Sequence, residues 1–144
     1  MKKAIPLVVA TLLLTACQSS GVGATGNVTS RDLQNHHFAL VSVNSEDVSN
    51  KEDSKLSITF NEKLFISGAM CNNFMGAGTL KNNVLTVKNL ARSQMYCINE
   101  RLNQWDQVLN NVLTKGAKVS LKGKKLTLVN GKNTLVYTVR DLAQ

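Results

Sequence analysis

The stretch ISGAMCNNFMGAGTL, residues 66–80, sets a cysteine and two asparagines between two short runs in which apolar residues alternate with small or polar ones. Such alternation is the period of a β-strand that has one face on a core. Gly68, Gly76 and Gly78 permit bulges and close backbone approach where a sheet curls. Asn72 suits a turn, because asparagine side chains hydrogen-bond nearby backbone. The stretch therefore predicts two neighbouring strands of a curled antiparallel sheet.

Similar runs lie on both sides of this stretch and are separated by turn residues. The strongest hairpin signal is Asn130-Gly131, because both residues tolerate positive φ. Antiparallel strands of this kind bury one face and leave the other in water. The runs lie at residues 38–43, 55–60, 63–68, 74–80, 84–90, 117–123, 124–131 and 133–142.

One segment follows a helical period instead. Asn99 is a suitable N-cap for it, and Lys115 followed by Gly116 is a suitable end. The predicted fold class is therefore α+β: a curled antiparallel β-sheet of about eight short strands packed on one amphipathic α-helix, with Trp105 in the core. The apolar residues recur at spacings of four and three, which marks one helix face, at Ile98, Leu102, Trp105, Leu109 and Val112.

The N-terminus, MKKAIPLVVATLLLTAC, is typical of a bacterial lipoprotein signal. Two lysines precede an apolar stretch of 13 residues, which is too short to span a bilayer and fits a cleaved secretory segment. The ending LTAC resembles a lipobox, in which the thiol of Cys17 takes a diacylglycerol and the new amino group is then acylated. We predict a signal peptide at residues 1–16, a flexible Gly/Ser/Thr-rich tether from lipidated Cys17 at residues 17–29, and one folded domain at residues 30–144.

This anchor sets the expected compartment. Gln18, rather than Asp, follows the lipidated cysteine, which in enterobacterial-type lipoproteins implies the outer membrane. The domain is therefore expected on the periplasmic face, where disulfides persist. Fifteen basic and nine acidic residues remain after the signal leaves, a net charge of +6 that we interpret as a solvated surface. The compartment excludes nucleic acid; the predicted partners are the membrane, through acylated Cys17, and an envelope protein or lipid ligand.

Two blocks of the chain resemble a known family. Residues 66–80 and the later stretch ARSQMYCINERLNQWDQVL are similar to the META domain, in which a Gly-x-x-Cys-Asn motif and a nearby Gly precede a second Cys that opens a helix. A lipobox followed by this domain is typical of bacterial heat-shock lipoproteins of the HslJ type. The resemblance covers residues 33–142 and implies an α+β sheet, a cell-envelope location, a link to stress and no established reaction. The matching residues are Gly68, Cys71, Asn72, Gly76 and Cys97.

The role of Cys71 and Cys97 has two main interpretations. The resemblance places Cys71 at a strand end and Cys97 at the start of the helix on the same sheet, which is compatible with a disulfide. With Cys17 lipidated, two cysteines remain, which favours a disulfide over two buried free thiols in an oxidising compartment. A nucleophilic cysteine needs a base within hydrogen-bond reach, and nothing in the sequence brings His36 or His37 to Cys71.

Metal binding is a weaker hypothesis, and we predict no metal and no cofactor. Soft sulfur ligands suit Cu(I), but methionine also fills irregular cores and no supporting His or Met-x-x-Met repeat accompanies these residues. The sulfur residues concerned are Met70, Cys71, Met75, Met95 and Cys97. A cluster of acids after the first predicted strand is expected in a solvated loop with weak Ca²⁺ binding at most: Glu46, Asp47, Glu52 and Asp53.

The sequence thus predicts a non-catalytic lipoprotein that supports envelope stress tolerance by binding or stabilising an envelope partner. Two alternatives remain open. One is a lipid- or small-molecule-binding module with an apolar groove between sheet and helix. The other is a thiol-redox or copper-handling protein with free thiols.

Overall fold

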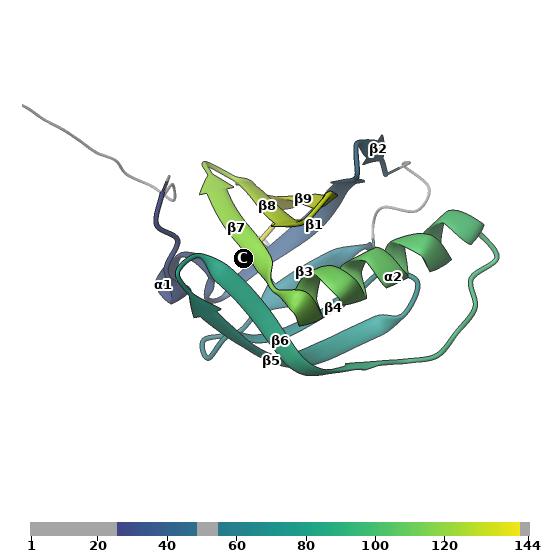
Figure 1. The fold of residues 1–144 in the computed structure, drawn as a ribbon, viewed down its shortest axis with the longest axis horizontal. Coiled ribbons are helices and arrows are strands. Elements are labelled where there is room, and N and C mark those ends of the chain that lie inside the picture. The colour runs from purple at the N-terminus through teal and green to yellow at the C-terminus, as the bar shows by residue number, and fades with distance from the viewer. Residues whose placement is uncertain (1–25, 49–54, 142–144) are drawn as a thin grey trace, which may run out of the picture.

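The structure is a computed structural model that describes residues 26–48 and 55–141 (Figure 1). The predicted signal peptide, Cys17 and the tether as far as residue 25 lie outside the described residues, as do Glu52 and Asp53. Within the described part of the chain, no helix has the length and apolar character that crossing a membrane requires. The anchor at Cys17 stays a prediction.

The described residues form nine strands and two helices, and each expected apolar run overlaps a strand. The predicted helical period overlaps the longer helix. The elements are α1 (Ser30–Leu33), β1 (His36–Val43), β2 (Glu46–Asp47), β3 (Ser57–Phe60), β4 (Phe65–Ala69), β5 (Asn73–Lys81), β6 (Val84–Arg92), α2 (Glu100–Lys115), β7 (Ala117–Lys122), β8 (Lys125–Asn130) and β9 (Asn133–Val139).

The sheet is antiparallel and closes on itself. Its strands follow the order β2-β1-β3-β4-β5-β6-β7-β8-β9, and β1 also pairs with β9, with Phe38 opposite Val139. Eight strands therefore form a barrel, with the two-residue β2 beside β1. The α+β class is confirmed, but the curled sheet of the prediction is a closed barrel. Closure pairs the two edges that a curled sheet would leave open.

The pairing between β6 and β7 is the shortest in the barrel wall, and α2 lies beside it. β6 and β7 pair over two residues only, at Val84 and Leu85 of β6. Helix α2 lies between β6 on one side and β7 to β9 on the other (Figure 1). Its apolar face completes the core, which confirms the prediction for Trp105. The buried apolar residues of α2 are Trp105, Leu109, Val112 and Leu113.

Both ends of α2 agree with the sequence signals. The side chain of Asn99 accepts a hydrogen bond from the Arg101 N–H at 3.0 Å, which satisfies one of the free amides of the first turn. Gly116 follows the helix with φ of 111°, a conformation that favours glycine.

The first described residues pack against the barrel. Val28, which the prediction placed in the tether, is buried, and its N–H donates to Asn83 Oδ1 at 2.8 Å. Asn83 in turn donates from Nδ2 to the Gly26 carbonyl at 2.8 Å. The packed part of the chain therefore begins before residue 30.

Side chains fill the barrel interior, and one of them carries an unpaired hydroxyl. Tyr137 on β9 is fully buried, and its hydroxyl has no hydrogen-bond partner among the described residues. Burial raises the pKa of Tyr137 far above its usual value, so the hydroxyl stays protonated. It lies opposite Leu40 on β1 and Leu126 on β8 and belongs to the same core cluster as Phe38 and Phe60.

Replacing Tyr137 with phenylalanine is expected to raise the free energy of unfolding by about 1 kcal/mol, because the change removes a buried polar group that is unsatisfied and keeps the ring. Chemical denaturation of both proteins measures the difference. A loss of stability in Tyr137→Phe would contradict this account, since it would mean that the hydroxyl makes a favourable hydrogen bond.

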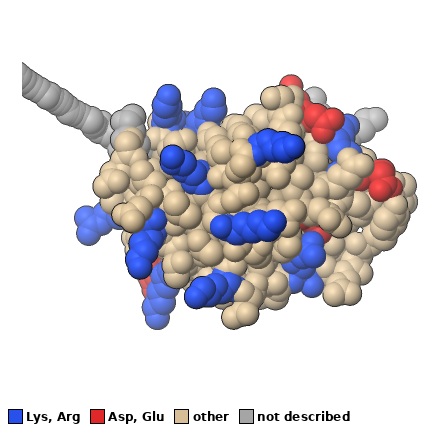
Figure 2. Space-filling model, in the orientation of Figure 1, with Lys and Arg blue, Asp and Glu red and all other residues tan. Residues whose placement is uncertain are grey.

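Lysine and arginine are unevenly placed in the chain. Residues 107–140 contain seven of these bases and no acidic residue. In Figure 2 the blue side chains are spread over the visible face, and the few red ones lie mostly toward the end where β2 and the start of α2 lie. The surface of β7 to β9 is therefore basic.

Candidate functional site

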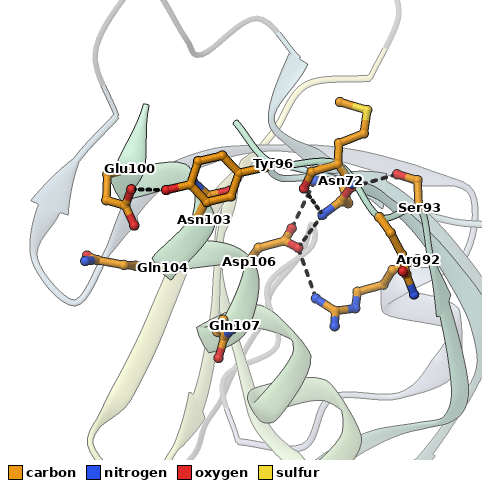
Figure 3. Close-up of a pocket in the computed structure, with 11 residues that line it drawn as sticks. Asn72, Arg92, Ser93, Tyr96, Glu100, Asn103, Gln104, Asp106 and Gln107 are labelled. Carbon is orange, nitrogen blue, oxygen red and sulfur yellow. Dashed lines mark hydrogen bonds and ion pairs between the residues drawn. The ribbon is translucent and has the colours of Figure 1, made fainter. Parts of the chain in front are cut away.

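A groove lies between the first turns of α2 and residues 92–96, which extend from β6 toward α2 (Figure 3). Its volume is about 630 Å³, within the usual range of ligand sites. Polar groups predominate in its lining, and Asn72 from the β4–β5 turn contributes as well. The lining residues are Asn72, Arg92, Ser93, Gln94, Met95, Tyr96, Glu100, Asn103, Gln104, Asp106 and Gln107.

A buried carboxylate organises the groove. Asp106 is 4% exposed, although it lies on a helix. Its Oδ1 accepts the backbone N–H of Asn72 at 3.1 Å, and its Oδ2 accepts Asn72 Nδ2 at 2.9 Å. The guanidinium of Arg92 donates to the same Oδ2 at 3.0 Å. A buried charge is tolerated when it is paired and hydrogen-bonded, and here both conditions are met.

Asn72, which Asp106 holds in place, in turn forms hydrogen bonds with residues 93–95. Its Oδ1 accepts the Met95 N–H at 2.6 Å and the Ser93 hydroxyl at 3.0 Å. The Ser93 N–H donates to the Asn73 carbonyl at 3.0 Å. The side chain of Asn72, just before the start of β5, thus takes the place that a neighbouring strand would have.

A disulfide and a second asparagine hold the next residues. Cys71 and Cys97 are bonded in the structure, with their Cα atoms 6.0 Å apart. Asn103 Oδ1 accepts the Cys97 N–H at 2.9 Å, and Asn103 Nδ2 donates to the Cys97 carbonyl at 2.8 Å. The disulfide that the sequence favoured is present, and neither of the cysteines in the described part of the chain is a free thiol. The redox and copper alternative needed those thiols.

The other candidate ligands are dispersed. His36 Nδ1 bonds to Asp141, and His37 Nδ1 bonds to Thr59, so neither ring is paired with a cysteine. Met70 is buried in the core, whereas Met75 and Met95 are exposed. Within residues 26–48 and 55–141, no group of three or more His, Cys, Asp or Glu side chains is placed to hold a metal ion.

Exposed apolar side chains lie on residues 95–98, beside the groove. Met95, Tyr96 and Ile98 are 59%, 74% and 100% exposed. The hydroxyl of Tyr96 donates to Glu100, and this hydrogen bond and the carboxylate charge raise the pKa of Tyr96. Exposed apolar groups on a segment that hydrogen bonds and a disulfide fix in place are typical of contact surfaces.

The glycines of the motif have a steric role. A Cβ atom at Gly68 would collide with the Ser57 carbonyl oxygen and the Phe74 ring, and one at Gly76 would lie 2.6 Å from a Val87 methyl group. Neighbouring atoms therefore lie so close to the backbone at both positions that any residue except glycine would force them to shift, as expected where a sheet curves.

Sequence reasoning missed Asp106, Arg92 and Asn103. A signal for Asp106 was present, because it lies four residues after Leu102 and three before Leu109, on the apolar face of the helix. An acid on such a face requires a buried partner. Arg92 and Asn103 are polar residues at exposed-looking positions, and no local pattern distinguishes them.

Known proteins share both sequence and fold with this chain. It is 42% identical over 142 residues, 99% of each chain, to the Heat shock protein HslJ of Escherichia coli (strain K12). A structure solved by NMR is 43% identical and has a TM-score of 0.75, covering 82% of this chain and 100% of its own. Another, from Burkholderia xenovorans, is 20% identical with a TM-score of 0.63 over 78% of this chain and 87% of its own, which shows a common fold. Residues 31–141 match the META domain, and the chain therefore belongs to the META domain family.

Proposed function

We propose that this protein is a lipoprotein of the outer membrane, anchored through acylated Cys17, that supports stress tolerance without catalysis by binding an envelope component in the groove between α2 and residues 92–96. The relation to a heat-shock protein supports the stress role. The lipobox sequence supports the anchor.

The observation that carries the binding role is that the polar groups on the floor of the groove already have hydrogen-bond partners within the protein. Both carboxylate oxygens of Asp106 and the side-chain oxygen of Asn72 are engaged in hydrogen bonds. These groups are therefore committed to holding the groove in shape, which favours recognition over proton transfer. The disulfide adds rigidity, and a preorganised surface loses less entropy on binding.

Binding of an apolar lipid in this groove is less well supported. The expected site was lined by Ile, Leu and Val, whereas this groove contains none of them and is rich in amide side chains. A smaller apolar hollow of about 220 Å³ lies beside it, with Phe74, Met75 and Ala91 in its wall. Its volume is below the usual range of ligand sites.

The anchor is tested by fractionation. The Cys17→Ala variant is expected to leave the membrane fraction, because the change removes the acyl chains and two or more chains are needed for stable attachment. Immunoblots of membrane and soluble fractions check this, with and without globomycin. A variant that stays in the membrane fraction would show that the lipobox interpretation is wrong.

The groove is tested by survival after heat shock in cells that express variants from the native locus. Gln107→Arg places a long side chain in the groove and is expected to lower survival to that of the deletion strain. Asn111→Arg is the matched control, because Asn111 is exposed on the same helix and does not line the groove. Both exposed changes should leave the free energy of unfolding within about 0.5 kcal/mol of the original. Equal survival of all strains would refute the proposed function.

A further inference from the structure

We infer that an extended polypeptide segment adds as a strand along the free edge of residues 93–97, the edge that faces away from Asn72 and Asn103. The inference goes beyond the proposed function, because it places a partner beside the groove and names the class of that partner. It is carried by the hydrogen bonds of these five residues, which have the alternation of a β-strand with one paired edge and one free edge.

The paired edge consists of every second residue. The Ser93 N–H donates to the Asn73 carbonyl, and the Met95 N–H donates to Asn72 Oδ1. The N–H and carbonyl of Cys97 both bond to the side chain of Asn103. Strand-like order thus continues past the end of β6, with two asparagine side chains in the place of a partner strand.

The free edge consists of the residues between them. The backbone N–H and carbonyl groups of Gln94 and Tyr96 make no hydrogen bond within the described residues. Peptide groups alternate in direction along an extended chain, so these four groups point away from the asparagines. An exposed, unpaired strand edge is a template for pairing with another chain.

The surroundings of this edge match a polypeptide backbone. Glu100, at the start of α2, hydrogen-bonds to the side chain of Tyr96, so a carboxylate lies near this edge. It favours a segment that is neutral or basic over one that is acidic. The exposed Met95 and Ile98 offer apolar contact to its side chains.

Hydrogen exchange followed by NMR tests the edge directly. The experiment uses residues 26–144, a part that is expected to fold alone because a 43% identical relative is solved as a chain matching 82% of this one. The amides of Met95 and Cys97 should exchange slowly and those of Gln94 and Tyr96 rapidly. Addition of an end-blocked hexapeptide of alternating valine and threonine should slow exchange at Gln94 and Tyr96. Protection at other positions, or at none, would overturn strand addition.

A pair of variants at one position separates backbone from side-chain recognition. Gln94→Pro removes the N–H, and proline is tolerated at a strand edge where the N–H faces solvent. It should lower affinity for the fluorescein-labelled hexapeptide by about three- to tenfold, the effect of one hydrogen bond. Gln94→Ala keeps the N–H and should change affinity less than about twofold. Equal losses in both variants would overturn the inference.

A peptide N-methylated at every residue is the matched ligand control, because it has the same side chains and no backbone donors. It should not bind measurably, and binding equal to that of the parent peptide would overturn strand addition. If neither peptide binds while Gln107→Arg still lowers heat survival, strand addition is wrong and the proposed function stands. If the parent peptide binds as described while the groove variants survive normally, the inference stands and the proposed function is wrong.

Discussion

Loss of the Cys71–Cys97 disulfide is expected to lower the free energy of unfolding by about 3–4 kcal/mol. The bond joins residues 26 positions apart, and the chain-entropy model assigns this magnitude to closing a loop of that length in the unfolded state. Cys71→Ser and Cys97→Ser should lose the same amount, because each change removes the same bond. Guanidinium denaturation of the two variants and the original protein measures the losses.

The double variant provides the control for this prediction. Changing both cysteines should cost no more than changing one, and a reducing agent should bring the original protein to the same stability. Unequal losses, or a double variant that is much less stable than either single one, would contradict the pairing. Faster exchange of the Cys97 amide in all three variants would show that the bond also keeps residues 93–97 in place.

Replacing Asp106 with alanine is expected to cost about 3 kcal/mol. The change leaves the backbone and side-chain N–H groups of Asn72 without their acceptor and removes the partner of Arg92. Hydrogen bonds to a charged group contribute about 1.5–3 kcal/mol each. The two bonds to Asn72 together give about 3 kcal/mol at the low end of this range. The bond to Arg92 adds little, because Arg92 is exposed and regains water. In a domain of this size the melting temperature should fall by about 10 °C.

The Arg92→Ala variant separates the stability contributed by the two Asp106–Asn72 hydrogen bonds from that contributed by the Arg92–Asp106 ion pair. Asp106 keeps its two bonds to Asn72 in this variant, so the loss should be about 1 kcal/mol, the value of a partly exposed ion pair. Thermal unfolding followed by circular dichroism gives both numbers. A loss in Asp106→Ala as small as that in Arg92→Ala would mean that Asn72 is held by other contacts.

Local patterns identified most of the secondary structure, although Glu46 and Asp47, which were expected in a loop, form β2. Alternation identified the strands, and the spacing from Ile98 to Val112 identified α2 together with its cap at Asn99 and its end at Gly116. These features depend on residues a few positions apart. The pairing of β1 with β9 joins segments about 100 residues apart, and both strands alternate in the same way whether the sheet closes or not. Closure was therefore not predictable from the alternation.

The candidate site also has residues that the sequence identified and residues that only the fold revealed. Cys71, Cys97 and Asn72 were singled out by the family motif, and the bond between the two cysteines is present in the structure. Arg92 was not singled out, because a base at a strand end is an ordinary local feature. Asp106 was missed although its position on the apolar face of α2 was a signal, and only the fold shows that its partners are Arg92, at 3.0 Å, and Asn72.

The sequence by itself determined which segments are strands, where the helix begins and ends, and which family the motif resembles. These properties follow from residue spacing and from the side chains that suit caps and turns. Only the tertiary structure decided that the sheet is a closed barrel and that Asn72 pairs with Asp106. It also decided that the peptide groups of Gln94 and Tyr96 have no partner among the described residues. Each of these depends on groups that meet across the fold, and the free energy of such contacts has no local signature in the chain.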